Sequence, residues 1–412
     1  MEIIFVILQT MTEKLIDKIQ SFNRDRLPEI LPLKYEGMTE NMFRFFRGTT
    51  HLFYEPISEE PVIKNCPSAW ICGDLHLENF GTFRSDNRQV YFDLNDYDEA
   101  VLAPVTWEVA RLLTSIFVAF ESLEIEEKKA FKMASLFLKS YSNILAKGKA
   151  IYVETRNATG IVGDFLKKVS KRKQNVILKK RTRKRNNKLE ILMDHQKHFA
   201  LPDERKDKIF KYVTEWLKND DRSPYNYKVI DAVFRVAGTS SLGLNRYVIL
   251  LKSLNNIGEK YMLIDMKQAS PSSLIPHLDI KQPSWETEAQ RIITVQESMQ
   301  NRCPALLSSS DFEGQSYIMQ EMQPEGDNIN FKLLSDRYRD MYTVIDNMAM
   351  LTASSQLRSS GQKGSAITDE LKEWAQSGDW QDSVLEYAHA YSNTVKEDYQ
   401  YYCAQYYSGV IH

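Results

Sequence analysis

Cysteine is scarce in this chain, and the four that occur show no metal-binding spacing. Structural zinc sites need regularly spaced cysteine or histidine ligands, so none is expected here. The cysteines are Cys66, Cys72, Cys303 and Cys403. Their low number in a chain of 412 residues favours a reducing, cytoplasmic compartment.

The chain also lacks a large net charge and a long apolar run. Its 53 Lys and Arg residues nearly balance its 55 Asp and Glu residues, so no overall field calls for nucleic acid or a membrane as partner. The opening residues MEIIFVIL are apolar, but a membrane-spanning helix needs about 20 apolar residues. No basic leader or small-residue cleavage site accompanies them. They predict an initial strand, or extra residues ahead of a start at Met11, and no transmembrane segment is expected.

The composition, with 43% hydrophobic and 26% charged residues, allows a large core in one two-lobed unit or two domains. Helical periodicity dominates the first block, residues 1–220, with helices predicted over Trp107–Phe120 and Glu126–Leu145. The second block, residues 228–323, reads as strands, with a turn at Asn255–Gly258 and one helix over Ser284–Met299, for which Ser284 is the candidate N-cap. The third block, residues 331–412, is helical again.

The most informative segment of the chain runs over Ile71–Ala100 and reads ICGDLHLENFG, a short gap, then VYFDLNDYDEA. Asp74 and Asn79 lie on a stretch too rich in Gly and polar residues to be a helix or strand, whereas Asp93 ends a predicted strand that begins at Gln89. A loop acid, a loop amide and a strand-end acid can converge on one Mg²⁺-bound triphosphate. Taken singly, each of these residues is equally well explained as a turn or capping residue.

GDLHLEN followed by FDLND resembles the catalytic and metal-binding loops of the aminoglycoside phosphotransferase branch of the kinase-like superfamily. Those loops read H-G-D-x-H-x-x-N and I-D-F-D-D, and Cys72 stands at the first His. Together with FRFFRGTTHLFYE (Phe43–Glu55) and WEVARLL (Trp107–Leu113), the same strings are similar to a bacterial family known as domain of unknown function 2252. That similarity runs through most of the chain.

The second block contains a glycine-rich loop between two predicted strands. Glycine lets backbone N–H groups approach phosphate oxygens closely, so the loop is a candidate phosphate cover. It consists of Ala237, Gly238, Thr239, Ser240, Ser241, Leu242 and Gly243. It matches neither the strict kinase loop nor the P-loop, because no Lys follows Gly243, and many such runs are ordinary hairpins.

Lys267 lies in the apolar strand Leu263–Ala269, where an unpaired lysine would be costly to bury. The resemblance implies that such a strand lysine binds the α- and β-phosphates of ATP and pairs with a helix glutamate, here Glu288 or Glu297, with Glu286 behind them. It also implies that Tyr317–Gln323 forms the last strand and the adenine-contacting hinge, which brings Glu321 and Gln323 to the nucleotide. The alternative for Lys267 is a solvated lysine on an edge strand.

The order of these parts is inverted relative to an ordinary kinase, because the catalytic loop and metal acid precede the glycine loop and lysine. We therefore expect an α+β, two-lobed, circularly permuted kinase-like fold. Residues 1–220 would give the catalytic-loop and metal-binding part of the helical lobe, residues 228–323 the nucleotide lobe, and residues 331–412 the helices that complete the helical lobe. Two independent domains are the alternative.

The resemblance assigns roles to the motif residues. Asp74 would accept or orient the proton of an attacking hydroxyl, and Asn79 and Asp93 would hold Mg²⁺. The expected reaction is ATP-dependent phosphoryl transfer to a hydroxyl-bearing acceptor, more in keeping with a small molecule than a protein. Nucleotidyl transfer on the same site and a nucleotide-binding pseudoenzyme remain alternatives.

Residues around the motif have less specific readings. His76 is expected to brace the loop, and Glu108 and Arg111 to form a structural contact beneath it. Arg47 could reach a phosphate or form an ion pair. Asp96 and Asp98 could contact metal or substrate, or could cap turns.

A basic run, Lys167–Lys188, contains twelve Lys or Arg and no acid. It could bind an anionic partner, or it could be a solvated basic helix and loop, as most such runs are. No aromatic residue interrupts it, which argues against binding to single-stranded nucleic acid.

Overall fold

The computed structural model describes residues 15–172, 174–186, 188–255, 260–323, 329–378 and 380–411. The predicted strand at the N-terminus and most of the predicted turn at Asn255–Gly258 lie outside the described residues. The fold mixes α-helices with antiparallel sheets, so the expected α+β class is confirmed.

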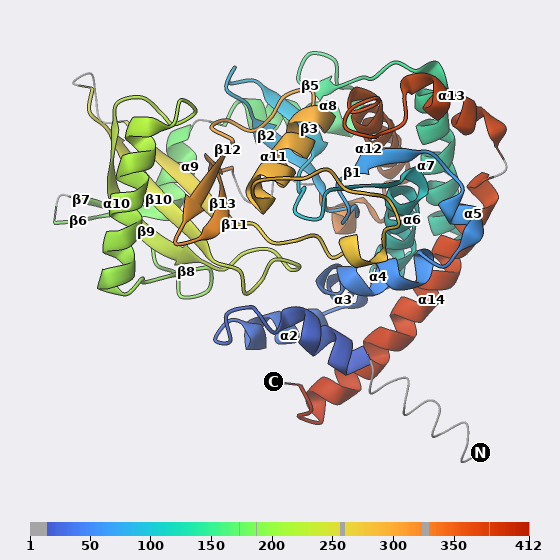
Figure 1. The fold of residues 1–412 in the computed structure, drawn as a ribbon, viewed down its shortest axis with the longest axis horizontal. Coiled ribbons are helices and arrows are strands. Elements are labelled where there is room, and N and C mark those ends of the chain that lie inside the picture. The colour runs from blue at the N-terminus through green and yellow to red at the C-terminus, as the bar shows by residue number, and fades with distance from the viewer. Residues whose placement is uncertain are drawn as a thin grey trace.

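A six-stranded antiparallel sheet forms one side of the molecule (Figure 1). Its strands in spatial order are β12 (Ser308–Phe312), β13 (Gln315–Glu321), β11 (Tyr261–Gln268), β10 (Arg246–Ser253), β9 (Tyr227–Arg235) and β8 (His198–Phe199). Strand alternation gives the sheet two faces. One carries Met262, Ile264 and Met266, which α10 (Asp203–Asn219) covers with Ile209 and Val213. The opposite face carries Leu263, Asp265 and Lys267 and turns toward the rest of the molecule.

Helices form the other side. They are α6 (Val105–Ser122), α7 (Glu127–Lys147), α12 (Tyr338–Arg358), α13 (Thr368–Ser377) and α14 (Trp380–Tyr407). The two helices predicted in the first block are present as α6 and α7. Helices of the third block pack against them, as expected from the sequence (Figure 1). Tyr141 of α7 and Glu108 of α6 both bond Gln356 of α12, at 2.5 Å and 3.0 Å.

Shorter elements complete the chain between these two sides. A helix over residues 15–23 precedes α2 (Leu31–Thr39), α3 (Met42–Gly48), α4 (Thr50–Ile57) and α5 (Pro61–Lys64). Strands β1 (Ser68–Ile71) and β4 (Val101–Pro104) pair, as do β2 (Phe80–Arg84), β3 (Val90–Leu94) and β5 (Val153–Glu154). The basic run carries α8 (Gly160–Ser170), α9 (Gln174–Arg181), β6 (Thr182–Arg185) and β7 (Lys188–Ile191).

Two sequence expectations about the arrangement were wrong. Helix α11 (Glu288–Met299) begins after Ser284, because Thr287 is its N-cap and accepts a hydrogen bond from the Gln290 amide at 3.1 Å. Residues 198–219, expected in the helical lobe, instead add β8 and α10 to the sheet. The reason is that the apolar face of α10 packs on the apolar face of the sheet that carries Met262, Ile264 and Met266.

Within the described residues, no helix combines the length and apolarity needed to cross a membrane.

Candidate functional site

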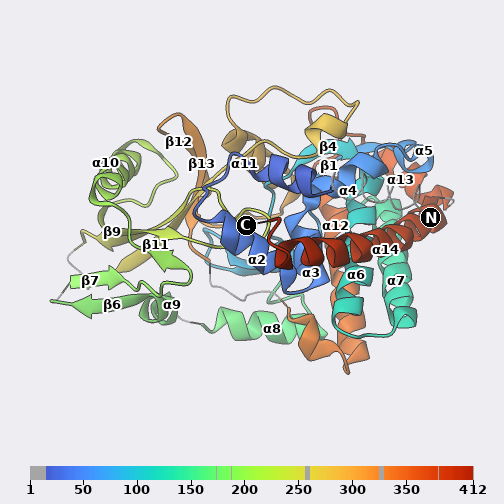
Figure 2. The same ribbon diagram turned by 90° about the horizontal axis from the view of Figure 1, so that it is seen from below.

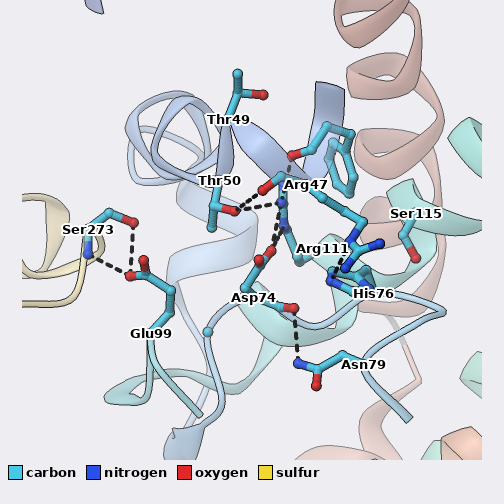
Figure 3. A network of polar contacts seen from close by, with 12 residues as sticks. Arg47, Thr49, Thr50, Asp74, His76, Asn79, Glu99, Arg111, Ser115 and Ser273 are labelled. Atoms are coloured by element: carbon cyan, nitrogen blue, oxygen red, sulfur yellow. Dashed lines mark hydrogen bonds and ion pairs between the residues drawn. The ribbon is translucent and has the colours of Figure 1, made fainter. Parts of the chain in front are cut away.

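The loop between β1 and β2 is held from below by two buried side chains of α6. Arg111 is fully buried and donates to one carboxylate oxygen of Asp74, Oδ1, at 2.8 Å from Nη2 and 3.2 Å from Nε. Its Nη2 also donates to the Phe46 carbonyl and to Thr50 Oγ1 (Figure 3). A planar guanidinium fixes its acceptors in one geometry, so Arg111 sets the orientation of Asp74.

Glu108, one turn before Arg111, holds the start of the same loop. Its carboxylate accepts the backbone N–H of Cys72 at 2.6 Å and the side-chain amide of Gln356 at 3.0 Å. Burial raises the pKa of Glu108 to about 7, although these donors act in the opposite direction. Glu108 and Arg111 thus lie beneath the loop as expected. Cys72 is itself buried, and burial raises the pKa of its thiol.

Asn79 ends the loop and is buried beside Asp74. Its side-chain amide donates to the carbonyls of Asp74 and Asp96, each at 3.2 Å. Arg47 Nε lies 3.1 Å from His76 Nε2 and the Glu78 amide lies 3.1 Å from His76 Nδ1, so the bracing contacts expected of His76 are present. A neutral imidazole accepts a hydrogen bond at one of these two nitrogens. Arg47 also pairs with Glu78.

Lys267 reaches across from β11 to the acidic segment that follows β3. Its ammonium pairs with Asp98 and lies 3.5 Å from Asp96 Oδ1. Burial disfavours the charged lysine, but the two carboxylates outweigh burial and raise its pKa. Burial likewise opposes ionised Asp96, yet the charge of Lys267 lowers its pKa. Burial and the neighbouring Asp96 raise the pKa of Asp98.

Arg291 of α11 fixes the acidic segment from the other side. It is buried, and its Nη2 donates to the carbonyls of Asp98 at 2.9 Å and Ser270 at 3.0 Å. The same guanidinium contacts the Ala100 carbonyl. Because Ser270 follows β11, Arg291 ties the end of the lysine strand to the acidic segment.

A second ion-pair cluster lies beside Lys267 on the inner face of the sheet. Arg246 binds both oxygens of Asp265, at 2.9 Å and 2.5 Å, and Arg235 lies 3.1 Å from Oδ1. Burial would raise the pKa of Asp265, but the two arginines outweigh it and hold the pKa below its usual range. The two arginines exceed the charge of Asp265 by one, so the cluster next to Lys267 carries a net positive charge.

These groups line one polar cavity with an empty volume of about 1280 Å³, part of it open to solvent. The charged and amide groups around it include Arg47, Asn79, Asp96, Asp98, Arg246, Asp265, Lys267 and Gln323. An apolar cavity of about 620 Å³ adjoins it, with Gln323 in both walls. Phe83, Val90, Leu263 and Met322 are among its lining residues. A polar compartment beside an apolar one is a common form of ligand site.

The glycine-rich loop joins β9 to β10, as predicted, and two of its residues need glycine. Gly238 and Gly243 have φ of +91° and +90°, in the region that favours glycine. A Cβ at position 238 would lie 2.5 Å from Ser241 Oγ. The loop and Lys267 line a small cavity together.

A sequence model of one bacterial protein family, described as "Uncharacterized protein conserved in bacteria (DUF2252)", matches residues 26–405. The chain belongs to the DUF2252 family. The match spans the β1–β2 loop, the sheet and the C-terminal helices, so the resemblance inferred from the motifs is confirmed at the level of this family. No curated protein and no solved structure matches the chain.

The structure does not bring every candidate residue of this DUF2252 protein to the polar cavity. Asp93 was expected at the metal, but its buried carboxylate accepts the Leu94 amide at 2.9 Å and does not line the cavity. Burial raises its pKa to about 6. Asp96 and Asp98 lie at the cavity instead, because the chain turns after β3 and only the residues beyond it face Lys267.

The expected partner of Lys267 was also wrong. Glu288 pairs with Arg291, at 2.6 Å from Nε, and Glu297 pairs with Arg222, at 2.8 Å. Among the described residues, no ion pair or hydrogen bond joins Glu286 to Lys267. Lys267 pairs instead with Asp98 and Asp96, which approach β11 from the segment after β3.

Glu321 and Gln323 lie at the end of β13, between the two cavities. Glu321 accepts a hydrogen bond from Arg88 at 2.7 Å and lines the apolar cavity. The side chain of Gln323 accepts the Arg84 amide at 3.0 Å. Both residues therefore link the sheet to β2 and its turn, where a ligand crossing from one cavity to the other would pass.

Sequence reasoning missed Arg291, Arg246 and Asp265. Asp265 stands two residues before Lys267 in the same strand, so alternation places both on one face, and this signal was available. The sequence does not indicate the contacts of Arg291 with the acidic segment, because the acceptors there are backbone carbonyls.

No group of three or more His, Cys, Asp or Glu side chains in the described part of the chain forms a complete metal cage. Mg²⁺ commonly binds through one or two carboxylates and completes its shell with phosphate and water. Asp96, Asp98 and Asn79 at one cavity fit such an open site.

The basic run lies on the surface of α8, α9 and the β6–β7 hairpin. Lys179, Lys180, Arg183, Lys184 and Arg185 are exposed. An anionic partner there remains a prediction.

Replacing Gly73 should loosen the catalytic loop. Its φ is +86°, and a Cβ would lie 2.3 Å from the Glu99 carbonyl oxygen. Gly73→Ala is expected to lower the free energy of unfolding by about 3 kcal/mol or more. The matched control is Gly314→Ala: its φ is +74°, but no atom lies within 4 Å, so only the backbone strain of about 1 kcal/mol applies. If urea denaturation gives the same loss of unfolding free energy for Gly73→Ala and Gly314→Ala, the close contact with Glu99 does not explain the glycine at position 73.

Glu108 should make stability depend on pH. Its pKa is raised from 4.5 to about 7 in the folded protein, so the folded state keeps the proton longer than the unfolded state. Stability is therefore lost as pH rises from about 5 to about 8, by up to about 3 kcal/mol. Glu108→Gln should remove this contribution. Urea denaturation across that range should give a flatter profile for the variant, and parallel profiles would rule out the assignment.

Proposed function

We propose that this protein transfers the terminal phosphoryl group of Mg²⁺-bound ATP to a hydroxyl group of a small-molecule acceptor. The contact of Lys267 with Asp96 and Asp98 carries the proposal. This contact brings a strand lysine to two acids of the segment that follows β3. Lys267 and Asp96 lie 171 positions apart in the sequence. Lys267, Asp96, Asp98 and Asn79 line one polar cavity, and Asp74 lies behind Asn79, whose side-chain amide donates to the Asp74 carbonyl. A lysine, carboxylates and a loop Asp–Asn pair are the parts that phosphoryl transfer requires.

We further propose that the fold is a circularly permuted kinase-like fold. Three features support this. The β-rich part contains the glycine loop, the lysine strand and the last strand in kinase order. The catalytic loop precedes them in sequence. The C-terminal helices α12 and α14 pack against α7 and α6, as they would if they completed the same helical lobe.

Lys267 and the backbone N–H groups of the glycine loop would bind the phosphates of ATP, since both line the same small cavity. Asn79 and Asp96, with Asp98 beside them, would hold Mg²⁺. The ion, when bound, neutralises charge that develops on the phosphate oxygens. Lys267 leaves the carboxylates for the phosphates when the nucleotide enters, which exchanges one anionic partner for another.

Asp74 would orient the acceptor hydroxyl. Both Arg111 contacts go to Oδ1, and among the described residues no hydrogen-bond donor reaches Oδ2. That oxygen can accept the hydroxyl proton. Because Arg111 fixes the orientation of Asp74, Asp74 acts mainly by positioning, which suits a transfer with little covalent chemistry for the protein to perform.

The apolar cavity would take the base of the nucleotide. It lies beside the end of β13, and its wall continues into the polar cavity at Gln323. Burying a planar base there removes apolar surface from water on both sides. The choice of a small-molecule acceptor rests on the resemblance to aminoglycoside phosphotransferases alone.

Asp96 and Asp93 should differ in their contribution to ATP affinity in Mg²⁺. Asp96→Asn should weaken ATP binding in Mg²⁺ at least about tenfold, because a carboxylate at the cavity is lost. Asp93→Asn should leave ATP affinity within about twofold, because Asp93 does not line the cavity. Isothermal titration of both variants with ATP in Mg²⁺ measures this. The reverse order of effects would assign the metal to Asp93.

Replacing Asp74 should lower the rate of phosphoryl transfer and leave the affinity for ATP nearly unchanged. Asp74→Asn keeps the Oδ1 acceptor for Arg111, so ATP affinity should change by less than about twofold. Phosphoryl transfer should fall by about 100-fold or more, because the hydroxyl loses its carboxylate. Acceptor libraries with ATP labelled at the γ- or the α-phosphate provide the assay. Label transferred only from the α-position would show nucleotidyl transfer and contradict the proposed reaction.

A further inference from the structure

The segment before α2 is bonded to the glycine loop through the loop carbonyls. Arg26 Nη1 donates to the carbonyls of Ser240 at 2.7 Å and Leu242 at 2.6 Å. Lys34, fully buried, donates to the same Ser240 carbonyl at 3.0 Å and to Asn23 Oδ1 at 2.8 Å. The backbone adds a further bond, from the Leu27 amide to the Gly243 carbonyl at 2.9 Å.

Holding these carbonyls also orients the amides that follow them. In a trans peptide the C=O and the next N–H point in opposite directions. The amides of Ser241 and Gly243 therefore point away from Arg26 and Lys34. Neither donates to any acceptor within the part of the chain that the structure describes. Ser241, Gly243 and Lys267 line one small cavity, so the two donors lie beside the lysine.

The contact between Arg26 and the loop is too close for a side chain at position 243. A Cβ on Gly243 would lie 2.7 Å from the Cβ of Arg26. The φ of +90° at Gly243 also favours glycine. Glycine at this position is thus explained by the approach of the N-terminal segment as well as by the turn.

The same segment is anchored on the helical side of the molecule. Tyr402 and Tyr399 of α14 donate to the carbonyls of Tyr35 at 2.9 Å and Thr39 at 2.8 Å. Figure 2 shows α2 lying between the sheet and the end of α14. The glycine loop is therefore fixed relative to the catalytic loop, and not only to its own sheet.

We propose that Arg26 and Lys34 are positioning residues that hold the glycine loop with the Ser241 and Gly243 amides directed at the phosphate chain of the bound nucleotide. This role rests on the proposed function. Because the donors are oriented before the ligand arrives, binding orders less of the chain, and affinity for the polyphosphate rises. Neither side chain touches the nucleotide in this arrangement.

The test compares Arg26→Ala, Arg26→Lys and Lys34→Met with Arg24→Ala, in full-length protein. Arg24 is exposed in the same segment and makes no side-chain contact with the loop, so it controls for the loss of one positive charge. Isothermal titration with ATP and with adenosine, both in Mg²⁺, gives the affinities. Thermal unfolding verifies that each variant is folded.

Arg26→Ala and Lys34→Met should each weaken ATP about tenfold. Arg26→Lys, which keeps the charge but has a single donor group, should fall between wild type and Arg26→Ala. Adenosine affinity should not change, because adenosine has no phosphate, and a general loss of structure would change it. Arg24→Ala should match wild type for both ligands.

If Lys34→Met does not fold, the two Arg26 variants decide, since Arg26 is only half-buried. Folded Arg26→Ala with wild-type ATP affinity would overturn the positioning role and leave the proposed function standing. A wild-type protein that does not bind ATP would overturn both.

Discussion

The candidate site depends on one ion pair that joins the sheet to the helical side, between Lys267 and the acids Asp98 and Asp96. Lys267 and Asp98 are largely buried and Asp96 is exposed, and ion pairs in either setting often contribute little net stability. Their retention at a cavity is therefore better explained by use than by stability. Arg291 and the Asp265 cluster surround the pair and keep its two sides at a fixed separation.

The β1–β2 loop depends on a second constraint, the buried face of α6. Glu108 and Arg111 are polar residues in a helix that is otherwise packed on nearly all sides. They donate to or accept from two groups of the loop, the Cys72 amide and the Asp74 carboxylate. Gly73 lets the loop pass close to the Glu99 backbone. The Glu99 carboxylate accepts hydrogen bonds from the amide and the hydroxyl of Ser273, which follows β11. Figure 3 shows Arg111 bonded to Asp74 and, separately, Glu99 bonded to Ser273.

Much of this arrangement could be predicted from sequence. Apolar alternation located the strands around Lys267, helical periodicity located α6 and α7, and loop chemistry located Asp74 and Asn79. The sequence did not predict which of several neighbouring acids reaches the cavity. Three acids within six positions, Asp93, Asp96 and Asp98, carry the same local signal, and only the turn after β3 decides which faces the cavity. The pairing of Lys267 failed for the same reason, because it depends on which element approaches the strand in space.

The N-terminal segment shows a different limit. Arg26 and Lys34 contact backbone carbonyls more than 200 positions away, and backbone acceptors leave no mark in the side-chain pattern. Tertiary approach, which local patterns do not encode, separates these cases from the successful predictions.

The proposed function requires that the two distant motif groups form one metal-dependent nucleotide site. Isothermal titration of the wild-type protein with ATP, first in Mg²⁺ and then in excess EDTA, measures this dependence. One binding site per chain is expected in Mg²⁺, with an affinity at least about tenfold lower in EDTA. Absence of binding, or equal affinity in Mg²⁺ and in EDTA, would rule out such a site.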